Sequence, residues 1–345
     1  MKITDVETTE QLRDFMTTPT DGLVQSLRDL EGDILVLGAA GKVGPELLDT
    51  VLRANEQAGT RRTVAAADLF LGDAAALRGR FEEMGVDVHA GDFTERSFLD
   101  RLPDYSHVIF MAGIKFGTSG DWRNAFHLNS IMPYLVGERF SQARIVVFSS
   151  GNPYPLTRPE QGGCKESDEL EPQGVYGWGI VARESAFATT ALKSSAQKVC
   201  FFRLMYAQHL SYGVLVDLAR MVRDGEPVSL AMPAVNLISQ RDAIDVALRA
   251  LRVCGNPPVV LNCAGPTTGV RYIVEKMGRQ IGCQPHLVGP EPETALVAND
   301  DFCLDTFGPY RDGVDDMIEA AANWVMMGGE DWDKPTMFGK VVRDY

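Results

Sequence analysis

Apolar runs and amphipathic stretches alternate along most of this chain. Residues 34–37 (ILVL) form a continuous apolar run, typical of a parallel strand that helices cover on both faces, and a helix-compatible stretch follows at 45–54. Further strands are predicted at 62–67, 86–90, 107–111, 144–148, 199–206 and 258–263. Strands that alternate with helices in this way predict an α/β fold built on a parallel sheet.

Three glycines connect the first predicted strand to the first predicted helix of that sheet. The unpaired N–H groups of a first helical turn can hold a pyrophosphate, and glycines let the backbone approach it closely. We therefore predict a dinucleotide-binding loop, with a structural turn of small residues as the alternative. The predicted cofactor contacts on this loop are Gly38, Ala40, Gly41, Lys42, Val43 and Gly44.

The pair Gly41-Lys42 raises a second possibility, the phosphate-binding loop of nucleotide hydrolases. That motif needs a glycine five residues before its Gly-Lys and a hydroxyl residue after it. Val36 and Val43 occupy those positions, so the motif is absent.

Composition narrows the functional classes. The 345 residues are 45% hydrophobic and carry a net charge of −14, which argues against binding to a nucleic acid backbone or an anionic membrane surface. The six cysteines are scattered without C-x-x-C pairs, which indicates neither a metal site nor a disulfide framework and favours the cytoplasm. The first residues lack the apolar segment of a signal peptide, and no run is long enough to span a bilayer.

Asp68 closes the second predicted strand, where an acidic side chain can accept both ribose hydroxyls of adenosine and would repel a 2′-phosphate. This position favours NAD over NADP. Lys42, Arg61 and Arg62 argue for the reverse. The alternative for Asp68 is a solvated strand end.

Ordered landmarks from about residue 33 to about 327 resemble the extended short-chain dehydrogenase/reductase superfamily, in its NAD-dependent epimerase/dehydratase family. They include G-x-x-G-x-x-G at 38–44, Gly-Asp-Phe at 91–93, Ala-Gly at 112–113 and YGWGIVARE at 176–184. The resemblance implies a Rossmann-type doubly wound parallel sheet with a smaller C-terminal α/β substrate domain. It also implies a homodimer and substrates such as sugars, sugar acids or nucleotide sugars.

The resemblance assigns roles to individual residues. Asp92 and Phe93 would hold the adenine, and Asn129 would help to order the active site. Ser150 would hydrogen-bond the substrate oxygen, and Tyr176 would accept or relay its proton while contacting the cofactor. The further cofactor contacts are Met111, Ala112, Gly113 and Asn129. The third catalytic candidate is Lys115, and the substrate contacts are Asn152 and Tyr206.

One departure from the family pattern affects the chemistry. Ile180 stands where the family has the lysine that lowers the pKa of the tyrosine and holds the nicotinamide ribose, and Gly179 replaces a small hydroxyl residue. Three interpretations remain open. Lys115 or Arg183 supplies the missing cation, Tyr176 acts as a neutral hydrogen-bond donor, or the protein binds dinucleotide without turnover.

The sequence also predicts a domain organisation. Residues 1–31 form a helical extension packed on the nucleotide domain, with a turn at 18–22. Residues 32–207, completed by about 236–264, form the NAD-binding domain. Residues 208–235 and 265–345 form the substrate domain, in which 288–298 is a surface loop over the site.

Two functional hypotheses follow. The first is an NAD-dependent oxidoreductase, epimerase or dehydratase that transfers hydride from a carbohydrate hydroxyl to the nicotinamide. The second is a catalytically silent dinucleotide-binding sensor or scaffold. Turnover of a sugar substrate would discriminate between them.

Overall fold

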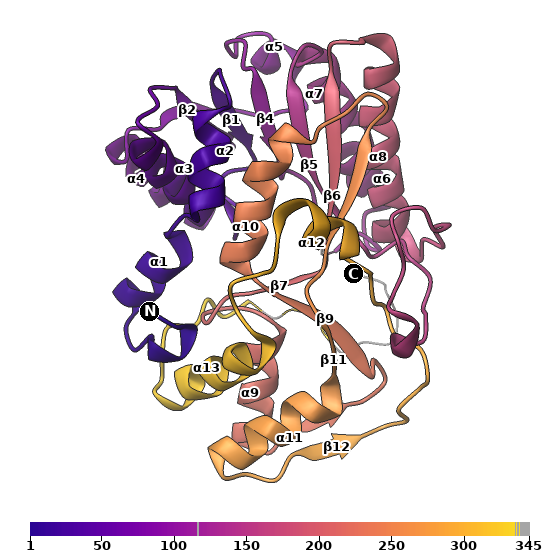
Figure 1. Cartoon of the computed structure of the whole chain (residues 1–345). Coiled ribbons are helices and arrows are strands. Elements are labelled where there is room, and N and C mark those ends of the chain that lie inside the picture. Colours follow the sequence, from indigo (N-terminus) through magenta and orange to yellow (C-terminus); the bar gives the residue numbers. More distant parts are fainter. Residues whose placement is uncertain (116, 335, 337, 339–345) are drawn as a thin grey trace.

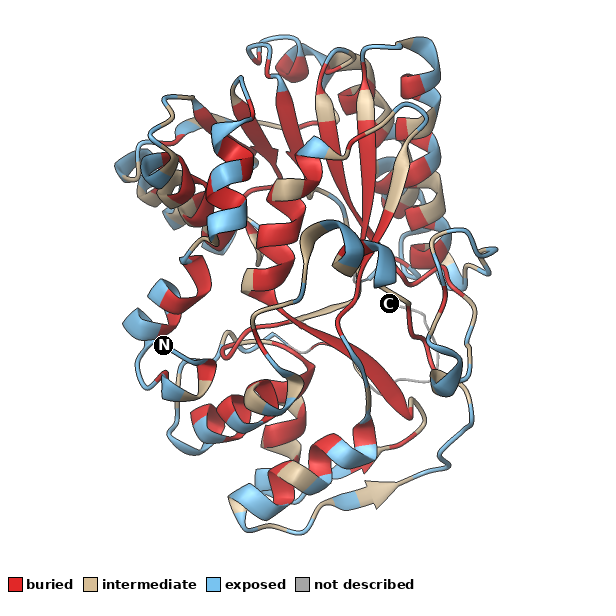
Figure 2. Cartoon of the chain, viewed as in Figure 1, coloured by how far each residue is buried: buried red, intermediate tan, exposed pale blue. Residues whose placement is uncertain are grey.

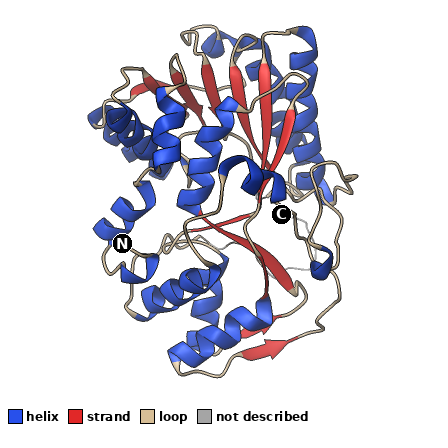
Figure 3. Ribbon diagram, viewed as in Figure 1, coloured by secondary structure: helices blue, strands red, loops and turns tan. Residues whose placement is uncertain are grey.

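A seven-stranded parallel sheet is the largest element of the computed structural model, which describes residues 1–115, 117–334, 336 and 338 (Figures 1 and 3). The strand order is β3-β2-β1-β4-β5-β6-β10. The strands are β1 (Ile34–Leu37), β2 (Val64–Asp68), β3 (Asp87–Ala90), β4 (His107–Phe110), β5 (Arg144–Ser150), β6 (Lys198–Leu204) and β10 (Val259–Cys263). The predicted doubly wound parallel sheet is confirmed.

The strand order reverses between β1 and β4, and this position creates the crevice in which ligands of such sheets bind. All four side chains of β1 are fully buried, as Figure 2 shows for the centre of the sheet. Ile34 and Val36 pack with one set of helices and Leu35 and Leu37 with the other, which explains the continuous apolar run.

Helices cover both faces of this sheet (Figure 1). Those packed with Ile34 and Val36 include α2 (Asp21–Arg28), α3 (Gly44–Ala58), α4 (Ala75–Glu83), α10 (Gln240–Arg249) and α12 (Asp301–Phe307). On the other face lie α5 (Arg96–Leu99), α7 (Met132–Arg139) and α8 (Gly174–Lys193). A short helix, α6 (Trp122–Phe126), and a π-helical turn, His127–Ile131, precede α7.

A second, smaller α/β lobe has its own core. Its strands form a three-stranded sheet, β11-β9-β7, and a pair, β12-β8. These strands are β7 (Tyr206–Gln208), β8 (Pro227–Ser229), β9 (Ala234–Ser239), β11 (Thr267–Gly269) and β12 (His286–Val288), and the helices are α9 (Val214–Asp224), α11 (Val270–Ile281) and α13 (Val314–Met326). Among the described residues, no helix has the length and hydropathy needed to cross a bilayer.

The N-terminal extension is helical and packs on the large domain, as predicted, but it also reaches the second lobe. Its first helix, α1 (Thr9–Thr17), contacts α3 and α10 of the large domain, and its Leu12, Phe15 and Met16 join the core of the second lobe, whereas α2 packs on the large sheet. The predicted turn at 18–22 is also too long, because the Thr20 side chain caps α2 by accepting the Leu23 N–H at 3.0 Å. Asp21 and Gly22 therefore belong to the helix.

The predicted surface loop at 288–298 is partly wrong. Ala295 and Ala298 are buried and form isolated bridges with Thr157 and Cys164. This pairing brings Leu296 to the boundary between the lobes, where it lines the cavity described below.

Candidate functional site

The glycine loop is held tightly at two of its three glycines. Gly38 has φ +83°, and a Cβ there would lie 2.6 Å from the Ala112 nitrogen. At Gly44, the first residue of α3, a Cβ would lie 1.9 Å from the Ala39 carbonyl oxygen. Neither position can carry a side chain without moving the backbone, so the loop and the N-terminus of α3 form a compact, bare cradle.

The residues predicted to bind adenosine lie at the ends of β2 and β3. The Asp68 carboxylate accepts the backbone N–H groups of Ala40 at 2.9 Å and Leu69 at 2.7 Å, so it ties the strand end to the glycine loop. Asp92 accepts both the N–H and the hydroxyl of Thr94 at 2.8 Å. The Phe93 side chain packs in the core, against the large sheet.

The segment after β4 carries Met111, Ala112, Gly113 and Lys115. Its position is fixed by Asn129, whose amide donates to the Ile114 carbonyl at 2.9 Å and whose Oδ1 accepts the Ile114 N–H at 3.3 Å. Asn129 is fully buried in the π-helical turn. In this structure Asn129 positions the loop that carries Lys115.

Arg183 fills the space behind this loop. Its guanidinium donates to the Phe148 carbonyl at 2.7 Å and to Asn129 Oδ1, and a Cβ on Gly113 would collide with it. Burial lowers the pKa of Arg183. Gly179 permits the close approach of α8, because a Cβ there would lie 3.2 Å from Asn129 Nδ2. The glycine at position 179 therefore leaves room for the buried hydrogen-bonded pair of Asn129 and Arg183.

Five predicted site residues come together around one small cavity of about 50 Å³ at the carboxyl ends of β5 and β6. They are Lys115, Ser150, Asn152, Tyr176 and Tyr206. Ser150 accepts the Asn152 N–H at 3.1 Å, which orients its hydroxyl, and Tyr176 reaches the cavity from the first turn of α8. Arg183 does not line this cavity.

Two lysines concentrate positive charge between this cavity and the glycine loop. The Lys115 ammonium lies 5.9 Å from the ring centroid of Tyr176, and that of Lys42 lies 3.7 Å from the ring centroid of Tyr212. Burial, and after it the charge of Lys42, lowers the pKa of Lys115 to about 8. Burial and the charge of Lys334 likewise lower the pKa of Lys42 to about 8. A bound diphosphate would relieve the repulsion between the two ammonium groups.

Sequence reasoning missed a buried network behind Ser150. Glu184 accepts the Ser149 hydroxyl at 2.5 Å and two hydrogen bonds from Arg203 at 2.9 and 2.7 Å, and Arg203 also donates to the Tyr154 hydroxyl at 2.8 Å. Glu184 closes the 176–184 segment noted in the sequence, but its pairing with Arg203 could not be predicted from the sequence. The network fixes α8 against the strands that carry Ser149 and Ser150.

The C-terminal segment was also missed as part of the site. Trp332 stacks on His209 with ring centroids 4.6 Å apart, and Phe338 contacts the edge of Tyr206 at 5.9 Å. These contacts join residues that are more than 120 positions apart in the sequence, and no local sequence pattern indicates them.

Comparison with known proteins supports the architecture. No protein-family model matches the sequence, and no curated protein matches it. MoeE5 in complex with UDP-glucose and NAD has a TM-score of 0.68 at 20% identity, over 86% of this chain and 99% of that one. Bordetella bronchiseptica WbmG in complex with NAD and UDP has a TM-score of 0.69 at 19% identity, over 88% and 97%. Bacillus cereus UDP-glucuronic acid 4-epimerase in complex with UDP-glucuronic acid and NAD gives 0.66 at 17% identity, over 85% and 99%. This chain therefore shares the fold of these proteins.

Proposed function

We propose that the protein is an NAD-dependent enzyme that oxidises a hydroxyl group of a nucleotide sugar or related sugar, as a net reaction or transiently during epimerisation or dehydration. The observation that carries this proposal is the convergence of Lys115, Ser150 and Tyr176 on one cavity beside the glycine loop. Three solved structures with the same fold hold NAD together with UDP-glucose, UDP-glucuronic acid or UDP, which supports the substrate class.

The residues present fit a dinucleotide. The cradle formed by Gly38 and Gly44 has no room for side chains, and the nearby Lys42 and Lys115 supply charge for a diphosphate. Asp68 would accept the adenosine ribose hydroxyls and repel a 2′-phosphate, so we propose NAD as the preferred cofactor. When bound, the nicotinamide supplies the hydride acceptor.

The protein side chains have to accept the proton of the substrate hydroxyl. Ser150 would hold the substrate hydroxyl, and Tyr176 would accept the proton of this hydroxyl as the hydride leaves the carbon that bears it. A tyrosine needs a nearby cation to do so at neutral pH. Lys115 shares the cavity with Tyr176, whereas Arg183 is engaged by Phe148 and Asn129, so we assign the role of the absent lysine to Lys115.

The test compares turnover with cofactor binding. Tyr176→Phe should lower kcat for a sugar-nucleotide panel at least about a hundredfold and leave the Kd for NAD within about threefold, because the ring remains while the proton acceptor is lost. Calorimetry gives the Kd, and product analysis gives the rate of oxidation or epimerisation. If the wild-type protein binds NAD but alters no sugar, sugar acid or sugar nucleotide, the catalytic assignment fails and the silent binding protein is favoured.

We further propose a cytoplasmic homodimer that pairs through α7 and α8. Exposed apolar side chains support this assignment, since Trp178 and Leu192 on α8 and Ile131 beside α7 are 55%, 86% and 52% exposed. Light scattering that gives the mass of one chain at micromolar concentration would contradict the dimer.

A further inference from the structure

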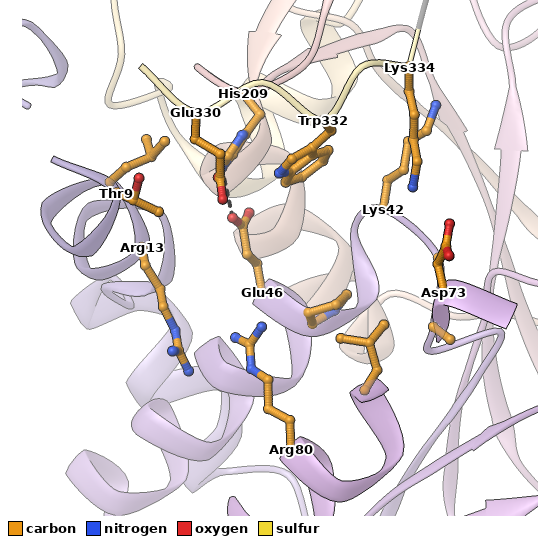
Figure 4. Close-up of a pocket in the computed structure, with 15 residues that line it drawn as sticks. Thr9, Arg13, Lys42, Glu46, Asp73, Arg80, His209, Glu330, Trp332 and Lys334 are labelled. Atoms are coloured by element: carbon orange, nitrogen blue, oxygen red, sulfur yellow. Dashed lines mark ion pairs between the residues drawn. The ribbon is translucent and has the colours of Figure 1, made fainter. Parts of the chain in front are cut away.

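A second and larger pocket, of about 530 Å³, adjoins the glycine loop (Figure 4). Its walls come from α1, the loop residues 40–42, the first turn of α3, α4 and the C-terminal residues 330–334. Asp68, Ser150 and Tyr176 do not line it, so it is distinct from the cavity of the proposed active site. Its volume is within the range of small-molecule sites.

Two arginines from different helices converge on one end of this pocket. Arg13 extends from α1 and Arg80 from α4, and Figure 4 shows both guanidinium groups beneath Glu46. Burial, and after it the charge of Arg13, lowers the pKa of Arg80. Two like charges brought together in this way repel each other, and an anion between them would be bound by both.

The Arg80 guanidinium is poorly satisfied by the protein. No hydrogen bond or ion pair among the described residues involves it, and its Nε is buried without a partner. Arg13 has one ion-pair contact, at 3.4 Å to Asp49, and Asp49 also pairs with Arg53 at 3.0 Å. A buried N–H donor without an acceptor is unfavourable, and a ligand oxygen that accepts from it would remove this cost.

The principal acidic groups of the pocket are, by contrast, already engaged. Glu46 accepts from Gln240 at 2.6 Å and lies 2.8 Å from His209 Nε2, and Glu330 accepts the Ser211 hydroxyl at 3.0 Å. Asp73 lies in an exposed 3₁₀ turn at another side of the pocket. Glu46 and Glu330 keep their charge but have hydrogen-bond donors within the protein, whereas the Arg80 guanidinium has no acceptor among the described residues; four cationic and three acidic side chains line the pocket.

Apolar surface completes the pocket. Leu12, Pro45 and Leu77 line it, and the indole of Trp332, fixed by its stack on His209, forms a further wall. An inorganic anion alone would leave this surface without a contact. The combination suits an organic molecule that carries a phosphate group.

We propose that this pocket binds a phosphorylated small molecule, with its phosphate between Arg13 and Arg80, while the dinucleotide site is occupied. Guanidinium groups hold phosphate oxygens in paired hydrogen bonds, and two of them from separate helices fix one phosphate. Because Ala40, Gly41 and Lys42 form both a wall of this pocket and part of the predicted cofactor loop, the ligand would contact the loop that holds NAD.

Calorimetry on the full-length protein saturated with NAD tests the proposal, with AMP and inorganic pyrophosphate as probes. We expect saturable binding of at least one probe, weakened about tenfold by Arg80→Gln or by Arg13→Gln. The matched control is Arg78→Gln, because Arg78 lies on the same helix, pairs with Glu82 and does not line the pocket. This control should bind both probes as the wild type does.

We expect AMP to bind more strongly than pyrophosphate, because only AMP meets the apolar walls; pyrophosphate that binds as strongly as AMP would contradict an organic ligand. Absence of saturable binding, equal binding by the arginine variants, or displacement of NAD by the probes would overturn it. Arg13 is half exposed, so Arg13→Gln keeps the test valid if Arg80→Gln folds poorly. If the protein fails to bind NAD, the same titrations without NAD still test the pocket, so the two proposals fail separately.

Discussion

Replacement of Lys115 by Met should stabilise the protein without cofactor and weaken its binding of NAD. Burial and Lys42 lower the pKa of Lys115 from 10.5 to about 8, which corresponds to at most about 3 kcal/mol of unfavourable free energy for the charged form in the folded state. Met keeps the apolar stem and removes this charge. Removing one cation next to a diphosphate should cost about 1–3 kcal/mol of binding, or roughly 10- to 100-fold in Kd.

Urea unfolding at pH 7 and calorimetry with NAD give the two quantities. The pH dependence supplies a further check. Between pH 8 and 10.5 the unfolded chain binds more protons at Lys115 than the folded chain, so this residue makes wild-type stability rise with pH in that window, and Lys115→Met should lack this contribution. Lys165→Met, at an exposed lysine, is the control and should change neither quantity. A variant that is less stable and binds NAD normally would refute the assignment of Lys115 to the cofactor site.

Two further substitutions probe the frame of the site. Arg203→Met should destabilise the protein by about 3–5 kcal/mol in urea unfolding, because it leaves the Glu184 carboxylate buried without its cation. Adding Glu184→Gln should recover part of this loss of stability. If Arg203→Met is as stable as the wild type, the ion pair is dispensable. Asp68→Ala should raise the affinity for NADP relative to NAD by about tenfold, because a negative charge near the 2′ position is lost; an unchanged ratio of the two Kd values would remove Asp68 from cofactor selection.

Burial on both faces explains why the large sheet was predictable. A strand such as 34–37 must be apolar throughout when helices cover both sides, so the central strands stand out in the sequence. Their ends were less certain. β2 begins at Val64 rather than at 62. The Thr63 backbone N–H donates to the Asp33 carboxylate at 2.7 Å, and the Arg62 guanidinium donates to the Leu30 carbonyl at 2.5 Å, just beyond the end of α2. Arg62 is therefore engaged away from the cofactor loop.

The candidate site, too, could be predicted only in part. Ser150 and Tyr176 could be placed because each follows a recognisable strand or helix start, and the topology brings those ends together. The sequence offered Arg183 as a candidate for the missing cation but could not show that Asn129 and Phe148 engage it. The partners of Trp332 and the destination of α1 depend on contacts between distant parts of the chain, for which periodicity carries no information.

The N-terminal extension connects the two hydrophobic cores through a short linker. The three residues Thr18, Pro19 and Thr20 separate α1, which joins the core of the small lobe and also contacts α3, from α2, which packs against the large sheet. Three residues reach roughly 10 Å when fully extended. A swing of the lobes must therefore separate α1 from the core of the small lobe or from α3, and in the latter case it can move α1 no further from α2 than this linker reaches. The N-terminal extension thereby restricts the opening of the crevice between the lobes, although it contributes no residue to the cavity around Tyr176.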